Sequence, residues 1–221
     1  MEKGNIFNGN NGNFEIGYYV YLPKDFKKED KYPMIVFLHG AGERGNGKED
    51  LKLVNVNALS KYASEGKEYP AILLCPQCPQ NFVWNNVVIE LKALIDSVAE
   101  EYGADKSRIS ITGISMGGFG TWEMGLTYPD FFSAIAPVCG GGLSWRCDLL
   151  KNTPVWAFHG DADTVVPPKN SYEMVDAVNA KGGHAKLTVF HGVGHGSWDS
   201  AYLETNVVEW LLSQKRVDFG K

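Results

Sequence analysis

The sequence has no long apolar run and no marked excess of charge. Because no run reaches the roughly 18 apolar residues of a membrane-spanning helix, we expect no membrane partner. The 21 basic and 26 acidic side chains give a formal net charge of −5, which does not favour binding to nucleic acid. Residues 1–5 lack the apolar segment of a secretory signal, so a cytoplasmic protein is expected unless a signal was removed.

Cysteine is scarce, with four residues in the chain. Cys75 and Cys78 have C-x-x-C spacing, but no second such pair follows, and a structural zinc site usually needs four ligands. These two cysteines are therefore expected at a buried strand end, and no metal is predicted. Cys139 and Cys147 could pair across a loop in an oxidising compartment, although nothing in the sequence requires it.

Short apolar runs alternate with helix-length segments along the whole chain, which favours an α/β fold. A mostly parallel sheet with helices on both faces is therefore predicted. Without a repeat or a composition break, residues 1–221 are expected to form one domain, with 1–13 as a loose leader or turn. Strands are expected at residues 14–22, 34–38, 71–75, 108–114, 134–138, 155–158 and 186–190, and helices at 87–102, 116–127, 170–180 and 200–212.

The segment 108–120 is typical of a strand, a tight turn and the start of a helix. It contains Gly113, Ser115 and Gly117 in the pattern G-x-S-x-G, which exposes a serine hydroxyl on a strained turn. A glycine-rich turn without chemistry is the alternative. Neither a P-loop nor a dinucleotide-binding pattern occurs at this helix start, so no cofactor is predicted and Ser115 is the candidate nucleophile.

A serine nucleophile needs a base, and this type of site has the chain order serine, acid, histidine. His195 lies in a glycine-rich loop after the last expected strand and is the preferred base, with His191 as the alternative. His39 and His159, at strand ends before glycine, are expected to order loops.

The candidate acid lies in the polar loop that follows residues 155–158. Asp163 is preferred over Asp161 because it stands well beyond the strand end, although either could be a turn aspartate. Its role would be to orient the imidazole and to stabilise its protonated form.

Backbone N–H groups are expected to stabilise the oxyanion of the tetrahedral intermediate. One donor would be Met116, directly after the nucleophile, and the other Ala41, with Gly42 as the alternative. Three tryptophans fall in loops near strand ends and could line a substrate pocket, or could simply be packed: Trp84, Trp145 and Trp198.

Taken together, these segments resemble the α/β-hydrolase superfamily, and within it the branch of phospholipase/carboxylesterase-like, feruloyl-esterase-like and predicted-peptidase members. The resemblance spans about residues 14–212 and rests on five stretches: 37–45, 76–79, 113–118, 159–163 and 194–195. It implies that Asp163 is the acid. Relatives called dienelactone hydrolases use a cysteine nucleophile, and Ser115 argues against that activity.

Only residues 139–153 separate the strands expected at 134–138 and 155–158, which is too short for a helical cap domain. An open site without a cap suits short-chain or aromatic acyl groups of a small-molecule ester. The sequence therefore predicts a serine carboxylesterase that needs no cofactor. A peptidase acting on short peptides is the alternative with the same residues, and a catalytically inactive binding module is a third.

Overall fold

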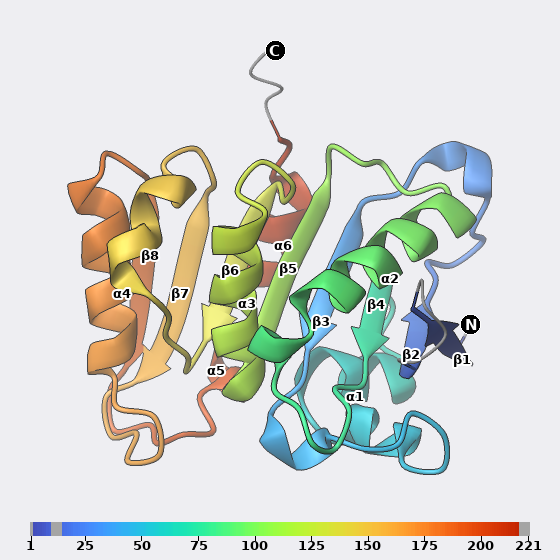
Figure 1. Cartoon of the computed structure of the whole chain (residues 1–221), viewed down its shortest axis with the longest axis horizontal. Coiled ribbons are helices and arrows are strands. Elements are labelled where there is room, and N and C mark those ends of the chain that lie inside the picture. The colour runs from blue at the N-terminus through green and yellow to red at the C-terminus, as the bar shows by residue number, and fades with distance from the viewer. Residues whose placement is uncertain (1, 10–14, 217–221) are drawn as a thin grey trace.

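The computed structural model of the chain describes residues 2–9 and 15–216. Eight strands form one sheet in the order β1-β2-β4-β3-β5-β6-β7-β8 (Figure 1). The first two strands are antiparallel to their neighbours, and the other six are parallel to one another. The strands are β1 Glu2–Asn8, β2 Glu15–Tyr21, β3 Met34–Leu38, β4 Ile72–Pro76, β5 Ile109–Ile114, β6 Ala134–Val138, β7 Val155–Gly160 and β8 Ala185–Phe190.

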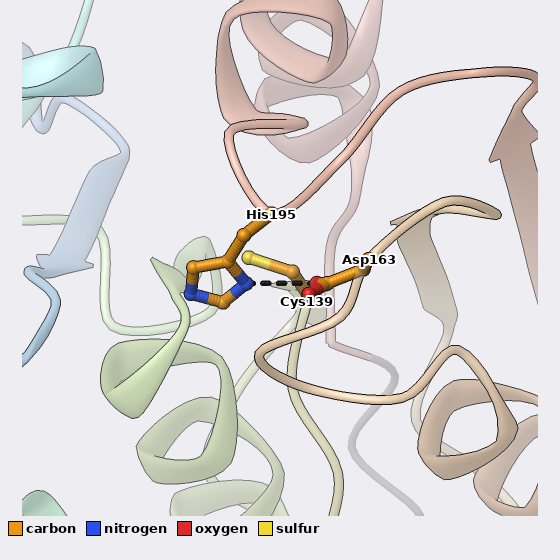
Figure 2. Close-up of side chains that lie close together, drawn as sticks. All are labelled: Cys139, Asp163 and His195. Carbon is orange, nitrogen blue, oxygen red and sulfur yellow. Dashed lines mark hydrogen bonds and ion pairs between the residues drawn. The ribbon is translucent and has the colours of Figure 1, made fainter.

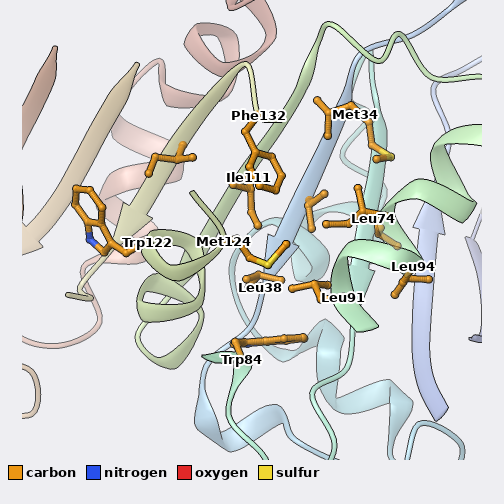
Figure 3. Packing of buried hydrophobic residues seen from close by; sticks show 14 of the residues in the cluster. Met34, Leu38, Leu74, Trp84, Leu91, Leu94, Ile111, Trp122, Met124 and Phe132 are labelled. Carbon is orange, nitrogen blue, oxygen red and sulfur yellow. The ribbon is translucent and has the colours of Figure 1, made fainter. Parts of the chain in front are cut away.

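The continuous apolar run of β3 serves two hydrophobic cores. Successive side chains of a strand point to opposite faces of the sheet. Accordingly, Val36 and Leu38 pack in one buried cluster, while Ile35 and Phe37 pack in the other. Figure 3 shows the first cluster, which includes Leu38. A strand covered on both faces is what the unbroken apolar run predicts.

Helices cover both faces of the sheet, as expected. The face with Val36 is covered by α2 (Val88–Glu101), α3 (Met116–Thr127) and α4 (Lys169–Ala180). The opposite face is covered by α1 (Ala58–Ser64), α5 (Trp198–Glu204) and α6 (Val207–Ser213). The predicted α/β-hydrolase architecture is therefore confirmed.

Two expectations about elements are wrong. Residues 2–8 are not a loose leader, because β1 pairs antiparallel with β2 along its whole length; residues 1 and 10–13 of that segment lie outside the described residues. The single helix expected at 200–212 is two helices. Thr205 is extended between them, and its hydroxyl accepts the N–H of Val207, the first residue of α6, at 3.2 Å.

The carboxyl ends of the parallel strands meet at one edge of the sheet, where α/β proteins place their sites. Loops that follow β3, β5, β6, β7 and β8 gather there. The connection from β6 to β7 contains only a 3₁₀ helix, Ser144–Leu150. No cap domain arises from this connection, as the sequence predicts.

Candidate active site

Ser115 is the single residue between the end of β5 and the start of α3. Its φ of 53° and ψ of −116° form a conformation that residues other than glycine rarely adopt. The Ser115 N–H is directed at the end of the neighbouring strand, 3.0 Å from the carbonyl oxygen of Val138 and 3.3 Å from the sulfur of Cys139. This backbone geometry is that of a nucleophile turn, which presents the hydroxyl at the strand edge.

Glycines at both sides of Ser115 permit this turn. A Cβ atom at Gly113 would lie 2.5 Å from the carbonyl oxygen of Gly117. A Cβ atom at Gly117 would lie 2.0 Å from the carbonyl oxygen of Leu38, at the end of β3. Since real Cβ atoms do not approach so closely, the G-x-S-x-G spacing is a steric requirement of this structure.

His195 joins Ser115 to Asp163 through two hydrogen bonds. Its Nε2 atom lies 2.8 Å from the Ser115 hydroxyl oxygen, and its Nδ1 atom lies 2.8 Å from Oδ2 of Asp163. Figure 2 shows the second of these contacts. A carboxylate only accepts, so Nδ1 carries the proton, and Nε2 is left to accept the proton of the serine hydroxyl. In this tautomer His195 can act as a base toward Ser115.

The carboxylate of Asp163 is buried and surrounded by donors. Oδ1 accepts the backbone N–H groups of Val165 and Val166, both at 2.9 Å, while Oδ2 accepts His195. Burial by itself would raise the pKa of Asp163, but these hydrogen bonds outweigh burial and lower the pKa below its usual value. Asp163 is therefore ionised at neutral pH.

The alternative acid and the alternative base pair with each other instead. Nδ1 of His191 lies 2.8 Å from Oδ2 of Asp161, and Oδ1 of Asp161 accepts the N–H of Gly192 at 2.7 Å. The His191 side chain is 89% exposed. The structure thus brings His195 and Asp163 to Ser115, and places Asp161 and His191 in a surface pair that ties together two loops.

The two segments that carry the sequence-predicted oxyanion donors border Ser115. Met116 opens α3, and Ala41 opens the 3₁₀ helix Ala41–Glu43, so neither N–H has a partner inside its own helix. Gly40 brings the Ala41 loop close to Ser115, because a Cβ atom at Gly40 would lie 3.7 Å from Cβ of Ser115. Both sequence-predicted oxyanion donors therefore belong to segments that border Ser115.

Side chains that were not recognised from the sequence hold the Ala41 loop in place. Nε2 of Gln77 donates to the carbonyl oxygens of Glu43 and Asp50 at 2.9 and 2.8 Å, and its Oε1 accepts the N–H of Gly47 at 2.8 Å. Such long-range partners of a loop leave no local sequence pattern. The Pro-Gln-Cys-Pro stretch, which carried part of the family resemblance, was the available signal.

His39 orders the same loop, as expected for a histidine before glycine. Its Nε2 atom accepts the N–H of Cys78 at 2.9 Å, so Nδ1 carries the proton and donates to the carbonyl oxygen of Gly40 at 2.6 Å. Burial lowers the pKa of His39 to about 4. His39 is therefore neutral and structural.

The three candidate tryptophans have different environments. Trp84 is fully buried, and its indole N–H donates to the carbonyl oxygen of His39 at 3.0 Å, so the expectation that Trp84 lines a pocket is wrong. Trp198 packs edge-on against the ring of His195, with 5.7 Å between centroids. Trp145 is 75% exposed on the connection between β6 and β7. Trp145 and Trp198 stay predictions as substrate contacts.

Burial makes all four free cysteines poor metal ligands and poor nucleophiles. Burial raises the pKa of Cys78 to about 12 and that of Cys139 to about 12. Cys139 lies beside Asp163 and His195, and potential metal-ligand atoms of these three residues lie within 4.8 Å of one another (Figure 2). A metal there would compete with the hydrogen bond between Asp163 and His195, so this grouping is better explained by the hydrogen bond.

The family follows from the sequence as a whole. Residues 16–201 match the family model described as "Dienelactone hydrolase family". The chain belongs to the dienelactone hydrolase family. This match covers the nucleophile turn, both candidate oxyanion segments, the acid and the base. The expectation that Ser115 argues against dienelactone hydrolase activity stays a prediction.

Proteins to which this chain is similar include esterases. The chain is 22% identical over 232 residues to poly(3-hydroxyalkanoate) depolymerase C of Paucimonas lemoignei, covering 85% of this chain and 51% of that protein. It is 23% identical over 195 residues to acetylxylan esterase A of Aspergillus ficuum, covering 80% of this chain and 60% of that protein. It is 33% identical to a thermostable esterase of known structure, with a TM-score of 0.84 over 97% of this chain and 63% of that one.

The chain thus spans about half to two thirds of the length of these three proteins. Within the described residues, no helix combines the length and apolar character needed to cross a membrane.

Proposed function

We propose that this protein is a serine carboxylesterase that hydrolyses small carboxylic esters through an acyl-enzyme on Ser115. The proposal rests on the two hydrogen bonds that link Ser115 to His195 and His195 to Asp163, next to the segments that carry the N–H groups of Ala41 and Met116. Esterases among the relatives of the chain support an ester as the substrate.

In acylation, the Ser115 hydroxyl oxygen forms a bond to the ester carbonyl carbon while its proton passes to Nε2 of His195. The carbonyl electron pair moves onto the carbonyl oxygen, and the N–H groups of Ala41 and Met116 stabilise the resulting negative charge. Each such donor typically lowers the barrier by about 3 kcal/mol. His195 then gives the proton to the alcohol oxygen as the bond between that oxygen and the carbonyl carbon breaks.

In deacylation, His195 takes a proton from water, and the water oxygen attacks the acyl carbon of the ester on Ser115. The second oxyanion forms at the same two N–H groups. When it collapses, the bond to Ser115 breaks, the serine oxygen recovers its proton from His195, and the carboxylic acid leaves. Throughout both steps the ionised Asp163 stabilises the protonated imidazole.

The absence of a cap between β6 and β7 favours short-chain or aromatic acyl groups. Without a helical cap from this connection, little apolar surface surrounds a long acyl chain. Exposed Trp145, on this same connection, and Trp198, packed on His195, are candidates to contact an acyl or aromatic group. An aromatic ring offers a flat apolar face that suits such groups.

A peptidase acting on short peptides is the second candidate, because the same three residues perform both reactions. The two reactions differ in the leaving group, since an amine leaves less readily than a nitrophenolate and requires proton donation by His195. The two candidates therefore make different predictions for an anilide and an ester of the same acyl group.

The test is a panel of a short nitrophenyl ester, a long nitrophenyl ester, a feruloyl ester and a peptide nitroanilide. Wild type is compared with Ser115→Ala and with Ser64→Ala, a matched serine on α1 whose hydroxyl donates only to the carbonyl oxygen of Lys61 in its own helix. Wild type and Ser64→Ala should hydrolyse the short ester equally, and Ser115→Ala should be slower by about 10⁶-fold.

Equal ester hydrolysis by wild type and Ser115→Ala would rule out the proposed mechanism. Faster turnover of the anilide than of any ester would favour the peptidase. A preference for the long acyl chain would contradict the argument from the missing cap.

A further inference from the structure

A second histidine contacts the carboxylate that orients His195. His159 is the penultimate residue of β7, and its side chain is completely buried. Its Nε2 atom lies 3.2 Å from Oδ2 of Asp163, the same oxygen that accepts His195, and 2.9 Å from the carbonyl oxygen of Val166. On the other side of the ring, Nδ1 lies 2.7 Å from the hydroxyl of Ser171, on α4.

These partners define the protonation of His159. Both neighbours of Nε2 are acceptors, so Nε2 carries a proton that is shared between Asp163 and Val166. Burial lowers the pKa of His159, so the ring is neutral and Nδ1 accepts the hydroxyl proton of Ser171. The nearby aspartate and carbonyl oppose this lowering but do not outweigh burial.

We infer that His159 is a positioning residue for the reaction proposed above: it holds Oδ2 of Asp163 in place toward His195. Neither Oδ1 donor can do this, because the N–H groups of Val165 and Val166 belong to the loop that carries Asp163 itself. His159 instead fixes the carboxylate to β7 and, through Ser171, to the start of α4. The single hydroxyl proton of Ser171 is shared between Nδ1 of His159, at 2.7 Å, and the carbonyl oxygen of Gly140, at 3.2 Å.

Removal of His159 has an electrostatic consequence with a definite sign. The titratable groups that face Asp163 within the described residues are His195 from the loop after β8, His159 from β7, and the Cys139 thiol after β6. The neutral His159 ring points the positive end of its N–H dipole at the Asp163 carboxylate. This weakens the attraction of the carboxylate for a protonated His195. Without this donor the protonated form of the base is favoured, and activity is lost at a higher pH on the acidic side.

Three variants test the inference with nitrophenyl acetate as the probe. His159→Leu removes the donor, whereas His159→Gln places an amide N–H near the position of Nε2. Ser171→Ala leaves the ring intact but removes the partner of Nδ1. The matched control is Val178→Ala, a change at a fully buried residue of α4 that has no contact with Asp163 and lowers stability through lost packing.

His159→Leu should lower kcat/KM by about 10-fold to 100-fold, mostly in kcat, because a misplacement of about 1 Å can cost about 100-fold. The acidic limb of its pH profile should move up by about half a pH unit, the effect of losing one hydrogen bond. His159→Gln should recover most of both effects, and Ser171→Ala should show a smaller change in the same direction. Val178→Ala should unfold at a lower temperature with an unchanged pH profile.

The inference is wrong if folded His159→Leu keeps the wild-type pH profile, or if His159→Gln loses as much activity as His159→Leu. If His159→Leu does not fold, an unchanged profile in Ser171→Ala overturns it. A readout independent of turnover is the downfield proton resonance of the His195–Asp163 hydrogen bond, identified by its loss in His195→Gln. This resonance should move and exchange faster in His159→Leu, and an identical resonance would contradict the inference.

These outcomes are separate from a failure of the proposed function. If Ser115→Ala hydrolyses nitrophenyl acetate as fast as wild type, the esterase mechanism fails while the proton resonance still tests His159. If hydrolysis depends on Ser115 and the His159 variants behave as wild type, only the role of His159 fails.

Discussion

Gly117→Ala should move the two proposed oxyanion donors, the N–H groups of Ala41 and Met116, apart through a single added methyl group. Gly117 is the second residue of α3, directly after Met116. A Cβ atom at this position would lie 2.0 Å from the carbonyl oxygen of Leu38 and 2.7 Å from that of His39. Both contacts are with the backbone that leads into the Ala41 loop, so no flexible side chain can move aside to relieve them.

The size of the effect follows from these distances. Real Cβ atoms keep at least 3.0 Å from other heavy atoms, so α3 and the end of β3 must separate by about 1 Å. A displacement of that size between catalytic groups can lower the rate by about 100-fold. Overpacking should cost about 1–3 kcal/mol of stability, partly offset by about 1 kcal/mol from the better helix propensity of alanine.

The assay is kcat/KM for nitrophenyl acetate together with thermal unfolding, and the control is Gly125→Ala in the same helix. The atoms nearest to a Cβ atom at Gly125 would be side-chain methyl groups of Ile135 and Leu150, the closest at 3.0 and 3.2 Å, and both side chains can adjust. Gly125→Ala should therefore keep wild-type activity. If Gly117→Ala is folded and as active as Gly125→Ala, the packing of α3 against β3 does not control the oxyanion site.

Three more outcomes are expected. Asp163→Asn should lower kcat by about 10⁴-fold, whereas Asp161→Asn should change it only a few-fold; similar losses measured for both would contradict the assignment of the acid. Partial burial alone would raise the pKa of Asp105, but hydrogen bonds from Ser107 and Arg108 lower it to about 2. A pKa that is lower in the folded state stabilises the protein above the unfolded pKa, and this stabilisation is lost as the pH falls through the folded value. Asp105→Asn should therefore lower the free energy of unfolding by about 1–2 kcal/mol at pH 7 and by nearly nothing below pH 2, as measured by denaturant unfolding. Dialysis against a chelator should leave ester hydrolysis unchanged, and a loss that zinc restores would show that a metal takes part.

The elements that bury apolar runs could be predicted from the sequence almost to the residue. β3 and β6 match the expected ranges, and α3 begins directly after Ser115 as the G-x-S-x-G pattern requires. These segments could be predicted from local sequence, because an apolar run indicates a buried strand and the G-x-S-x-G pattern indicates a turn. The chain order serine, acid, histidine limited the acid to Asp161 or Asp163 and the base to His191 or His195. Loop position and the family resemblance then selected Asp163 and His195, which the structure joins to Ser115 by hydrogen bonds.

What could not be predicted depends on partners far away in the sequence. β1 has few apolar residues, and its strand form comes from pairing with β2. Trp84 falls in a segment that the sequence predicts as a loop, yet the fold buries it against His39. The contact between His159 and Asp163 exists only because β7 and the loop after it fold back on each other.

The most direct test of the account is to trap the intermediate. Wild type mixed with excess nitrophenyl acetate and quenched rapidly in acid should carry one acetyl group, located by peptide mass spectrometry on the peptide containing Ser115. Ser115→Ala should carry none under the same conditions, and His195→Gln should acylate far more slowly. Turnover of the ester without an acetyl group on Ser115, or with the label on another residue, would contradict the central claim that Ser115 is the nucleophile.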